Sequence, residues 1–447
     1  AGADQYSDGH LSSAGVSHPE LFRKIGYHIA RQTSLNSFKP QDFSNTAWAF
    51  ATAGASHPEL FKKIGNHLAG LMSLNSFNPQ ALSNTAWSFA TAGISYPELF
   101  RKIGDHVAEL GCFDSFKPQE LSNTVWACAT IGHTDERLFS AFAPVIRSKL
   151  DECSEQDLAN IAWAYSVANL PRHDLFNEGY AGALASNENE FSVEEFRQLH
   201  QWQLWQQELQ SGIELPRSLR AKCRNAFTSR GFSESKLQND VVDELRIAGL
   251  DLEEEVLLGS GYRIDALVKV GDGRKVAIEV DGPFHFIDRR PAGRTTLKHR
   301  QVATLDRIEV VSVPYWEWDE LKNSEMKQHY LRKKLALSYI IQSIYGRKIS
   351  SRCTAHNSGI ALCDVLPALV HGTNNTRAAP RRRHRYLRPE PLEPVFGPLG
   401  RVRDGVPGQQ AREQAQEQGL EATGVPQDEQ GREEHARQDE APHRQAR

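Results

Sequence analysis

The chain has 447 residues, of which 39% are hydrophobic and 24% are charged, and its formal net charge at pH 7 is -4. This length is enough for two or three domains, and the near-neutral charge excludes a uniformly basic nucleic-acid-binding chain, so any phosphate-binding surface must be local. No apolar run approaches the length of a membrane span. The six cysteines show neither CxxC nor His–Cys ligand spacing, which argues against a zinc site and favours a reducing compartment.

The region from Val16 to Gly212 is an internal repeat with a period of 39 residues. The segment from His18 to Gly26 recurs twice, at residues 57–65 and 96–104. A second segment recurs at residues 43–48, 82–87 and 121–126, more loosely at 158–163, and in a degenerate fifth copy at 196–205. Each unit predicts two helices. Prolines 19, 58 and 97 stand where a first-turn proline is tolerated, and the second helix of the first unit begins near Lys39–Gln41.

A helical hairpin of this size cannot bury its apolar face alone, so the copies are expected to stack into an α-solenoid. Residues Ser12–Gly15 look like the tail of such a unit. We therefore expect the sequence to begin inside a larger protein, with any targeting peptide missing.

An asparagine and a tryptophan recur in register along the repeats. Asparagines 45, 84, 123 and 160 either read base edges or form a structural ladder that hydrogen-bonds backbone between repeats. We favour the ladder, because an identical residue in every unit reads no varied sequence. Tryptophans 48, 87, 126 and 163 are expected in the core between repeats, and glycines 26, 65 and 104 should permit close helix contact.

After Gly212 the pattern changes. Residues 215–232 predict a linking helix whose Arg217, Arg220, Lys222 and Arg224 either contact phosphates or are solvated. The following segments predict an αβββαβ order, with a helix at 236–250, strands at 252–258, 262–270 and from 274, a helix at 295–304 and a strand at 308–313.

The second and third strands form a hairpin, because Gly271–Gly273 supplies a tight turn between two alternating runs. With the turn centred on Asp272, Asp265 faces Glu279 and Arg263 faces Asp281. Facing carboxylates need a cation, a shared proton or a lysine to hold them. One chemical use of such a pair, Asp265 and Glu279, is to hold Mg²⁺, and that is a nuclease arrangement.

The segment from His285 to Arg300 is the densest basic stretch of the ordered region. Cations for phosphates and aromatic faces for bases occur together there, as a single-strand binding edge requires. The candidate RNA contacts are Phe284, His285, Phe286, Arg289, Arg290, Arg294, Lys298 and Arg300. As an alternative, Lys298 reaches the Asp265 and Glu279 pair as a catalytic lysine, and we favour the phosphate-contacting or solvated reading. Trp316 and Trp318 are expected to pack.

Residues 237–335 resemble the RAP domain of organellar RNA-handling proteins, a family that includes the FAST kinase-like proteins. The resemblance rests on Ile264-Asp265, the run from Ile278 to Phe286, Thr296 to Arg300 and Val311 to Trp318. The RAP domain is similar to the PD-(D/E)XK nuclease fold, whose pattern maps onto Asp265 and Glu279. Asp281 stands where that pattern has its lysine, which argues against cleavage. The repeats resemble octotricopeptide repeats, which implies single-stranded RNA along the inner helices.

We therefore expect an α-solenoid at residues 1–212, a linker helix at 213–235, a RAP domain of restriction-endonuclease-like type at 236–346 and a disordered tail at 347–447. The tail carries an arginine run at 381–385 and no lysine after Lys348. The resemblance implies a mitochondrial or chloroplast protein that binds single-stranded RNA to affect rRNA or mRNA processing, stability or translation.

Further partners implied are organellar ribonucleoprotein or ribosome-assembly proteins, and no membrane, small-molecule substrate or cofactor is expected. One alternative is an endoribonuclease. In this hypothesis Asp265 and Glu279 hold Mg²⁺, with or without Asp281 as a third ligand, and Lys298 stabilises the negative charge that develops on the phosphate. The other is a solenoid scaffold that binds proteins. We expect a binding protein, not an enzyme.

Overall fold

A computed structural model describes residues 18–349 except 173, 230, 232–234 and 272, and for residues 337–349 it describes the backbone alone. All of the described residues lie in one compact unit. The expectations for Ser12–Gly15, for the turn residue Asp272 and for the tail beyond residue 349 fall outside the described residues.

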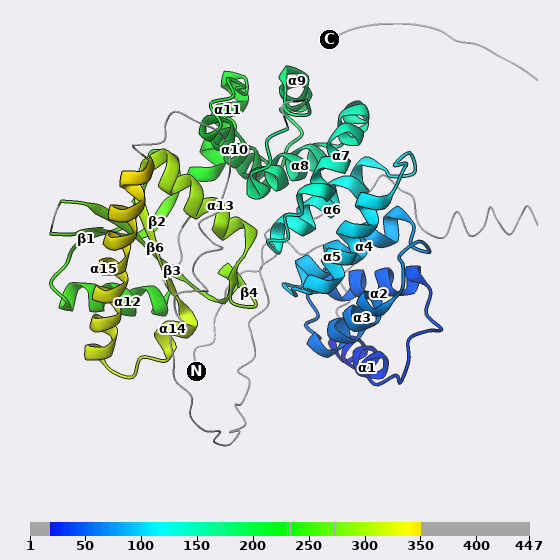
Figure 1. Ribbon diagram of the computed structural model, residues 1–447, viewed down its shortest axis with the longest axis horizontal. Coiled ribbons are helices and arrows are strands. Elements are labelled where there is room, and N and C mark those ends of the chain that lie inside the picture. The colour runs from blue at the N-terminus through cyan, green and yellow to red at the C-terminus, as the bar shows by residue number, and fades with distance from the viewer. Residues whose placement is uncertain (1–17, 173, 230, 232–234, 272, 350–447) are drawn as a thin grey trace, which may run out of the picture. The chain divides into compact units, whose positions relative to one another are not determined.

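Helical hairpins stacked side by side build the N-terminal half (Figure 1). The first helices of the hairpins are α1 (Pro19–Ala30), α3 (Pro58–Gly70), α5 (Pro97–Glu109) and α7 (Glu136–Ser148). The second helices are α2 (Pro40–Thr52), α4 (Pro79–Thr91), α6 (Pro118–Thr130), α8 (Glu155–Ala168) and α10 (Val193–Glu208), with α9 (Glu178–Ser186) and the short 3-10 helix η1 (Leu150–Glu152) between units. Each second helix packs against the next one along the chain. The predicted stacking of helical repeats is confirmed.

Glycines inside the first helices allow the units to approach closely. A Cβ atom on Gly26 would lie 2.3 Å from the His57 ring, and one on Gly65 would lie 2.7 Å from the Tyr96 ring. Both rings stand immediately before the first-turn proline of the next unit. The prediction that these glycines permit close contact between helices is confirmed.

The tryptophan prediction is correct at one end of the solenoid and wrong at the other. Trp126 and Trp163 are buried, with 4% and 6% of their surface exposed, and their rings lie 6.4 Å apart. Trp87 is half-buried, whereas Trp48 is 40% exposed. Trp126 and Trp163 are buried because α10 and helix α13 (Gly293–Gln301) of the C-terminal domain pack over the last units.

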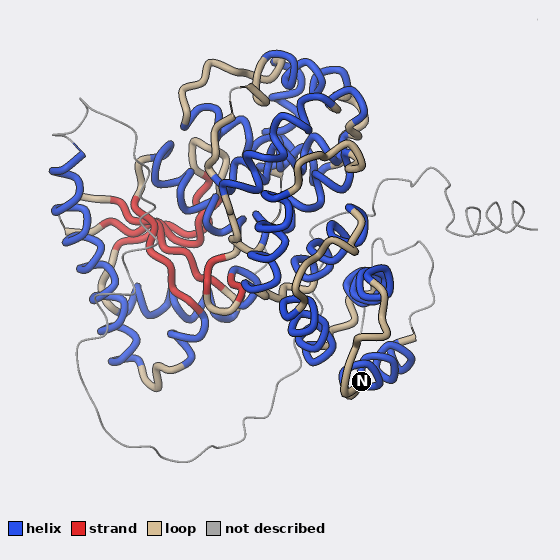
Figure 2. Tube along the Cα trace, turned by 45° about the vertical axis from the view of Figure 1, so that its right-hand side comes forward, coloured by secondary structure: helices blue, strands red, loops and turns tan. Residues whose placement is uncertain are grey.

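A four-stranded sheet forms the core of the C-terminal domain, with helices on both faces (Figure 2). The strand order is β1–β2–β3–β6, antiparallel except for the parallel pair β3 and β6. The strands are β1 (Asp251–Leu257), β2 (Arg263–Lys269), β3 (Lys275–Asp281) and β6 (Glu309–Pro314). The helices are α12 (Lys236–Ile247), α13, the π-helix η3 (Val302–Asp306), α14 (Tyr315–Asp319) and α15 (Ser324–Ile349). The preceding helix α11 (Arg217–Thr228) packs against α10 and buries Leu219 and Cys223 in the core of the repeats.

The order αβββαβ is as predicted, and the pair Ala266 and Ile278 confirms the register implied by a turn centred on residue 272. The alternating sequence of β3 is typical of a strand with one buried face, and that interpretation is wrong, because both faces are buried. Val276 and Ile278 pack in the apolar cluster with α12 and α15, and Ala277 packs in a second cluster with Val302 on the opposite face. β3 is buried on both faces because α12 and α15 cover one face of the sheet and η3 packs on the other.

A small hairpin that we did not predict lies between β3 and α13. Its two strands are β4 (Phe286–Ile287) and β5 (Arg290–Pro291), and the 3-10 helix η2 (Pro283–His285) leads into the first of them. Its two-residue turn, Asp288 and Arg289, has φ values of 50° and 63°. Both residues lie in the left-handed region that such hairpin turns require, without the glycine that usually marks them.

Across the described ranges, none of the helices combines the length and the apolar character needed to cross a bilayer.

Candidate functional site

Three carboxylates from β2 and β3 lie together beneath α13. Glu279 and Asp281 are 1% and 0% exposed. The register places Asp265 opposite Glu279, as predicted, and the backbone N–H of Val280 donates a hydrogen bond to Asp265 Oδ2 at 2.6 Å. Burial raises the pKa of Asp265, and the charge of Lys298 and the Val280 hydrogen bond partly offset that rise.

Lys298 reaches this acidic cluster from α13. Its Nζ donates to Glu279 Oε2 at 2.6 Å. The reading that we favoured from sequence, a solvated or phosphate-contacting lysine, is therefore wrong, and the alternative contact with Glu279 is formed. Burial raises the pKa of Glu279 to about 8, although the adjacent ammonium lowers it.

Arg263, the residue predicted to face Asp281, does not pair with it, and Asp281 has other neighbours. Arg263 donates to the backbone oxygen of Glu255 at 2.7 Å instead of pairing with Asp281. Asp281 Oδ2 accepts a hydrogen bond from Ser312 Oγ and lies 3.8 Å from His299 Nε2.

His285 Nδ1 lies 2.8 Å from the other oxygen of Asp281, Oδ1. Burial would raise the pKa of Asp281, yet His285, His299 and Ser312 together bring it below its usual value. Asp281 is therefore a buried carboxylate that stays ionised.

Glu279, Asp281 and His299 each offer a ligand atom, and these atoms lie within 4.8 Å of one another. Burial lowers the pKa of His299 to about 4, so its imidazole is neutral at pH 7 and able to bind a metal ion. The predicted magnesium pair was Asp265 and Glu279. Asp265 is not part of the close group, which contains Asp281 and His299 in its place.

The basic segment divides into engaged and exposed side chains. Phe286 packs edge-on against Trp316 with ring centroids 4.3 Å apart, and Arg289 lies over the same ring at 5.7 Å. Arg294 donates to the backbone oxygen of Phe284, whose side chain is 45% exposed. Arg290 is exposed on β5. Trp318 is buried, as predicted, and donates to Asp240.

Arg300 is a structural contact between the domain and the repeats, contrary to its predicted RNA contact. Its guanidinium pairs with Glu208 of α10 at 3.2 Å. It also donates to the backbone oxygens of Ser166 and Val167 at the end of α8, at 2.6 and 3.3 Å. These contacts satisfy carbonyl groups that a helix C-terminus leaves open.

The asparagines do not form the expected ladder to backbone. Asn160 is buried and accepts a hydrogen bond from Gln198 of α10 at 3.0 Å. For Asn45, Asn84 and Asn123, no side-chain hydrogen bond occurs within the described part of the chain, and Asn45 is exposed while the other two are half-buried. They remain available to a ligand.

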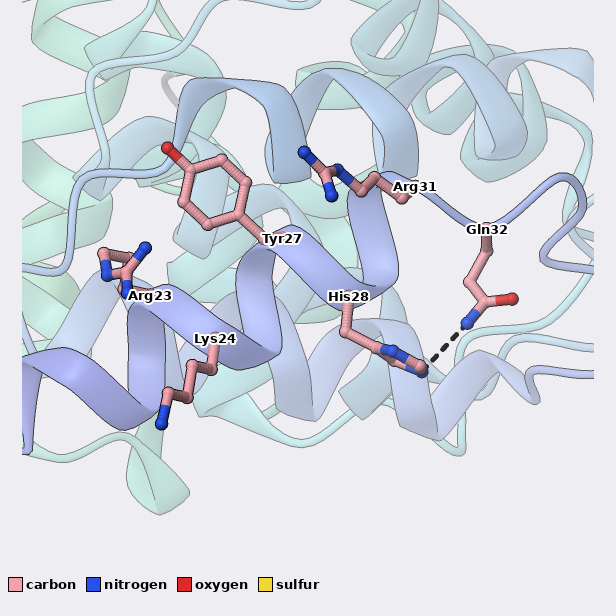
Figure 3. Close-up of a pocket in the computed structure, with 6 residues that line it drawn as sticks. All are labelled: Arg23, Lys24, Tyr27, His28, Arg31 and Gln32. Atoms are coloured by element: carbon pink, nitrogen blue, oxygen red, sulfur yellow. Dashed lines mark hydrogen bonds between the residues drawn. The ribbon is translucent and has the colours of Figure 1, made fainter.

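One surface was missed by sequence reasoning. A pocket on α1 is lined by Arg23, Lys24, Tyr27, His28, Arg31 and Gln32 (Figure 3). The guanidinium groups of Arg23 and Arg31 lie 5.7 and 5.9 Å from the centre of the Tyr27 ring. The basic pair at positions 23 and 24 recurs at 62–63 and 101–102, so the repeat itself carried the signal.

The fold and this site define the class of protein: stacked helical repeats followed by a small α/β domain of restriction-endonuclease-like type. Residues 278–334 match the RAP domain family, so the chain contains a RAP domain. A stretch of 198 residues is also 28% identical to a rice protein (Oryza sativa subsp. japonica) described as "RAP domain-containing protein, chloroplastic". That match covers 41% of this chain and 30% of the rice protein, so the chain spans under a third of its relative's length.

Proposed function

We propose that this protein binds single-stranded RNA in an organelle and acts there in rRNA or mRNA processing, stability or translation. The observation that carries the proposal is the row of Asn45, Asn84 and Asn123 on α2, α4 and α6, whose amides have no hydrogen-bond partner in the described structure. Asn45 and Asn84 stand three residues before Trp48 and Trp87, so in these two units an amide and an indole that is at least partly exposed share one helix face. In the third unit Trp126 is buried, and Asn123 acts alone.

This pairing suits bases in a single strand. An amide pairs with a base edge, and an aromatic face stacks on any base for about 1–3 kcal/mol. Because the same residues recur in each unit, the row contributes affinity without discriminating between bases. Phosphate contacts come from the hairpin β4–β5, where Arg289 and Arg290 are exposed and Pro291 approaches Gly132 at the end of α6.

The comparisons with known proteins support the proposed organellar location. The RAP domain and the chloroplast designation of the rice protein both favour an organellar location for this chain. Chloroplast and mitochondrion remain the two options, to be decided by localising the tagged full-length protein in cells.

Fluorescence anisotropy with labelled single-stranded RNA in EDTA tests the proposal. The double variant W48A/W87A should weaken binding by about tenfold or more, because each lost stacking contact is worth about 1–3 kcal/mol. Leu21→Ala, on an exposed side chain of α1, is the control. A protein that retains no RNA at low salt would instead support the solenoid scaffold that binds proteins.

A matched arginine pair tests the phosphate contacts. Arg290→Ala should weaken RNA binding and reduce its salt dependence by about one phosphate contact. Arg300→Ala should lower thermal stability and leave the salt dependence unchanged, because Arg300 is bound to Glu208 and α8. Equal effects of both substitutions on the salt dependence would contradict this assignment.

A second function, metal-dependent RNA cleavage, is favoured by the contact between Lys298 and Glu279. Asp265 and Glu279 would hold Mg²⁺, which supplies an activated water, and Lys298 would stabilise the negative charge that develops on the phosphate. RNA incubated with Mg²⁺ should then be cut by the natural chain and stay intact with Glu279→Gln or Lys298→Ala. Binding without cutting in the presence of Mg²⁺ would exclude this function.

A further inference from the structure

Glu279, Asp281 and His299 form a close group between β3 and α13. The two acids are two positions apart on β3, so they project from the same face of the strand, and His299 reaches that face from the helix. Their ligand atoms lie within 4.8 Å of one another.

Two of the three side chains have a buried polar atom without a hydrogen-bond partner, Glu279 Oε1 and His299 Nε2. The third, Asp281, has its Oδ1 atom 2.8 Å from the ring nitrogen Nδ1 of His285. Leaving such a group unpaired in the interior costs about 1–3 kcal/mol, and more when the group is charged. Two unpaired atoms beside a buried carboxylate therefore call for a common partner.

The remaining carboxylate oxygens are held in place. Lys298 donates to Glu279 Oε2 and Ser312 donates to Asp281 Oδ2. Glu279 thus has one anchored oxygen and one open oxygen, whereas Asp281 has Oδ2 anchored by Ser312 and Oδ1 beside the His285 ring. Outer hydrogen bonds of this kind orient the ligands of metal sites.

We propose that Glu279, Asp281 and His299 bind one divalent transition-metal ion, with Zn²⁺ preferred over Mn²⁺ and Mn²⁺ over Mg²⁺. Two carboxylates and one imidazole suit Zn²⁺, which is held by nitrogen and oxygen ligands and often by three protein side chains. Mg²⁺ prefers oxygen ligands alone. The order of Zn²⁺ and Mn²⁺ follows the general affinity series for nitrogen and oxygen sites.

This site differs from the predicted nuclease pair. It uses Asp281, which stands where the nuclease pattern has its lysine, and it leaves out Asp265. The cysteine spacing that argued against zinc does not bear on it, because none of its ligands is a cysteine. His285, with Nδ1 2.8 Å from Asp281 Oδ1, is a neighbour that would turn aside or join the site when the ion enters.

Equilibrium dialysis of the full chain, without a tag and stripped with EDTA, tests the proposal with Zn²⁺, Mn²⁺ and Mg²⁺ in turn. The natural chain should bind one Zn²⁺ that His299→Gln and Asp281→Asn each lose. Ser312→Ala should bind it about 10–100-fold more weakly, because it removes an outer hydrogen bond. His67→Gln, a half-buried histidine on α3, should bind as the natural chain does.

Thermal unfolding provides a second readout. Zn²⁺ should raise the midpoint of the natural chain and leave that of His299→Gln unchanged, because an ion that binds only the folded state stabilises it. Midpoints measured in EDTA show whether each variant folds. If Asp281→Asn does not fold, Glu279→Gln and His299→Gln decide the question.

Three results would overturn the proposal. The first is Zn²⁺ binding that survives in His299→Gln and Glu279→Gln, which would indicate adventitious surface binding. The second is loss of the ion in Asp265→Asn with retention in His299→Gln, which would assign it to the nuclease pair. The third is tighter binding of Mg²⁺ than of Zn²⁺. RNA binding measured in EDTA does not depend on any of them.

Discussion

In the acidic cluster, a lysine on a helix pairs with a glutamate on the neighbouring strand. The nuclease pattern places its lysine two residues after the glutamate, where this chain has Asp281. Lys298, on α13, brings its Nζ within 2.6 Å of Glu279 instead. The cation that three neighbouring acids require is therefore present, and the sequence position of the lysine by itself says little about the chemistry available.

His200 is a second buried residue whose charge state matters. Its Nε2 lies 2.8 Å from the backbone oxygen of Ser260, and because a carbonyl only accepts, Nε2 carries the proton. Its ring packs on Phe227 at 4.6 Å. Burial lowers the pKa of His200 to about 4, so the folded protein holds it neutral at pH 5, where the unfolded chain is protonated.

We expect acid to destabilise the protein through this residue. The His200 contribution is complete above the unfolded pKa of about 6.5 and falls as the pH drops from there towards 4. At pH 5 the loss is about 2 kcal/mol. Thermal unfolding at pH 7.5 and pH 5.0 should show a smaller change for His200→Gln than for the natural chain. An unchanged pH dependence in the variant would contradict this, since His299 titrates in both proteins.

Among the elements, the first helices of the repeats occupy different surroundings despite nearly identical sequences. Leu21 on α1 is 52% exposed, whereas Leu60 and Leu99, at the same position in α3 and α5, are 0% and 1% exposed. The α3 and α5 residues are covered by the preceding unit. In the described part of the chain, the corresponding side of α1 is open.

The same substitution should therefore change the stability by very different amounts in two units. Leu60→Ala should cost about 2–5 kcal/mol, because it leaves a cavity in the core. Leu21→Ala should change the free energy of unfolding by about 0.5 kcal/mol or less, as exposed substitutions do. Urea unfolding measures both. Equal losses would mean that α1 is covered in solution.

At the scale of the compact unit as a whole, the RAP domain is joined to the repeats by a packed polar contact. Gln301 of α13 donates to the backbone oxygen of Gln201 and accepts from Tyr262, and Arg300 binds α8 and α10. Gly293 permits the approach, since a Cβ there would lie 2.0 Å from the backbone oxygen of Ala129.

Gly293→Ala should loosen this contact. Backbone atoms cannot yield as a flexible side chain can, so we expect a loss of about 1–3 kcal/mol or more. Hydrogen exchange should then become faster in α13 and at the end of α6. Gly70→Ala is the control, because a Cβ on Gly70 meets nothing within 4 Å. Natural protection of α13 in Gly293→Ala would show that the domains are not held at this point.

Sequence reasoning located the elements and part of the site. First-turn prolines and the 39-residue period gave the helices, and a turn centred on residue 272 placed Asp265 opposite Glu279. The hairpin β4–β5 was missed because its turn has Asp288 and Arg289 in place of glycine. The partner of Asp281 was misjudged because register predicts the facing residue but not where a long side chain such as Arg263 turns.

What the sequence determined by itself is local and periodic: the repeats, the strand alternation and the acids on one face of β3. These follow from spacings of two, three or four residues and from the chemistry of single turns. Tertiary structure alone decided that Arg300 binds Glu208, 92 residues away, that Trp48 stays exposed while Trp163 is buried, and that His299 meets Glu279 and Asp281. Such contacts depend on how whole helices pack, and no short spacing in the chain encodes that.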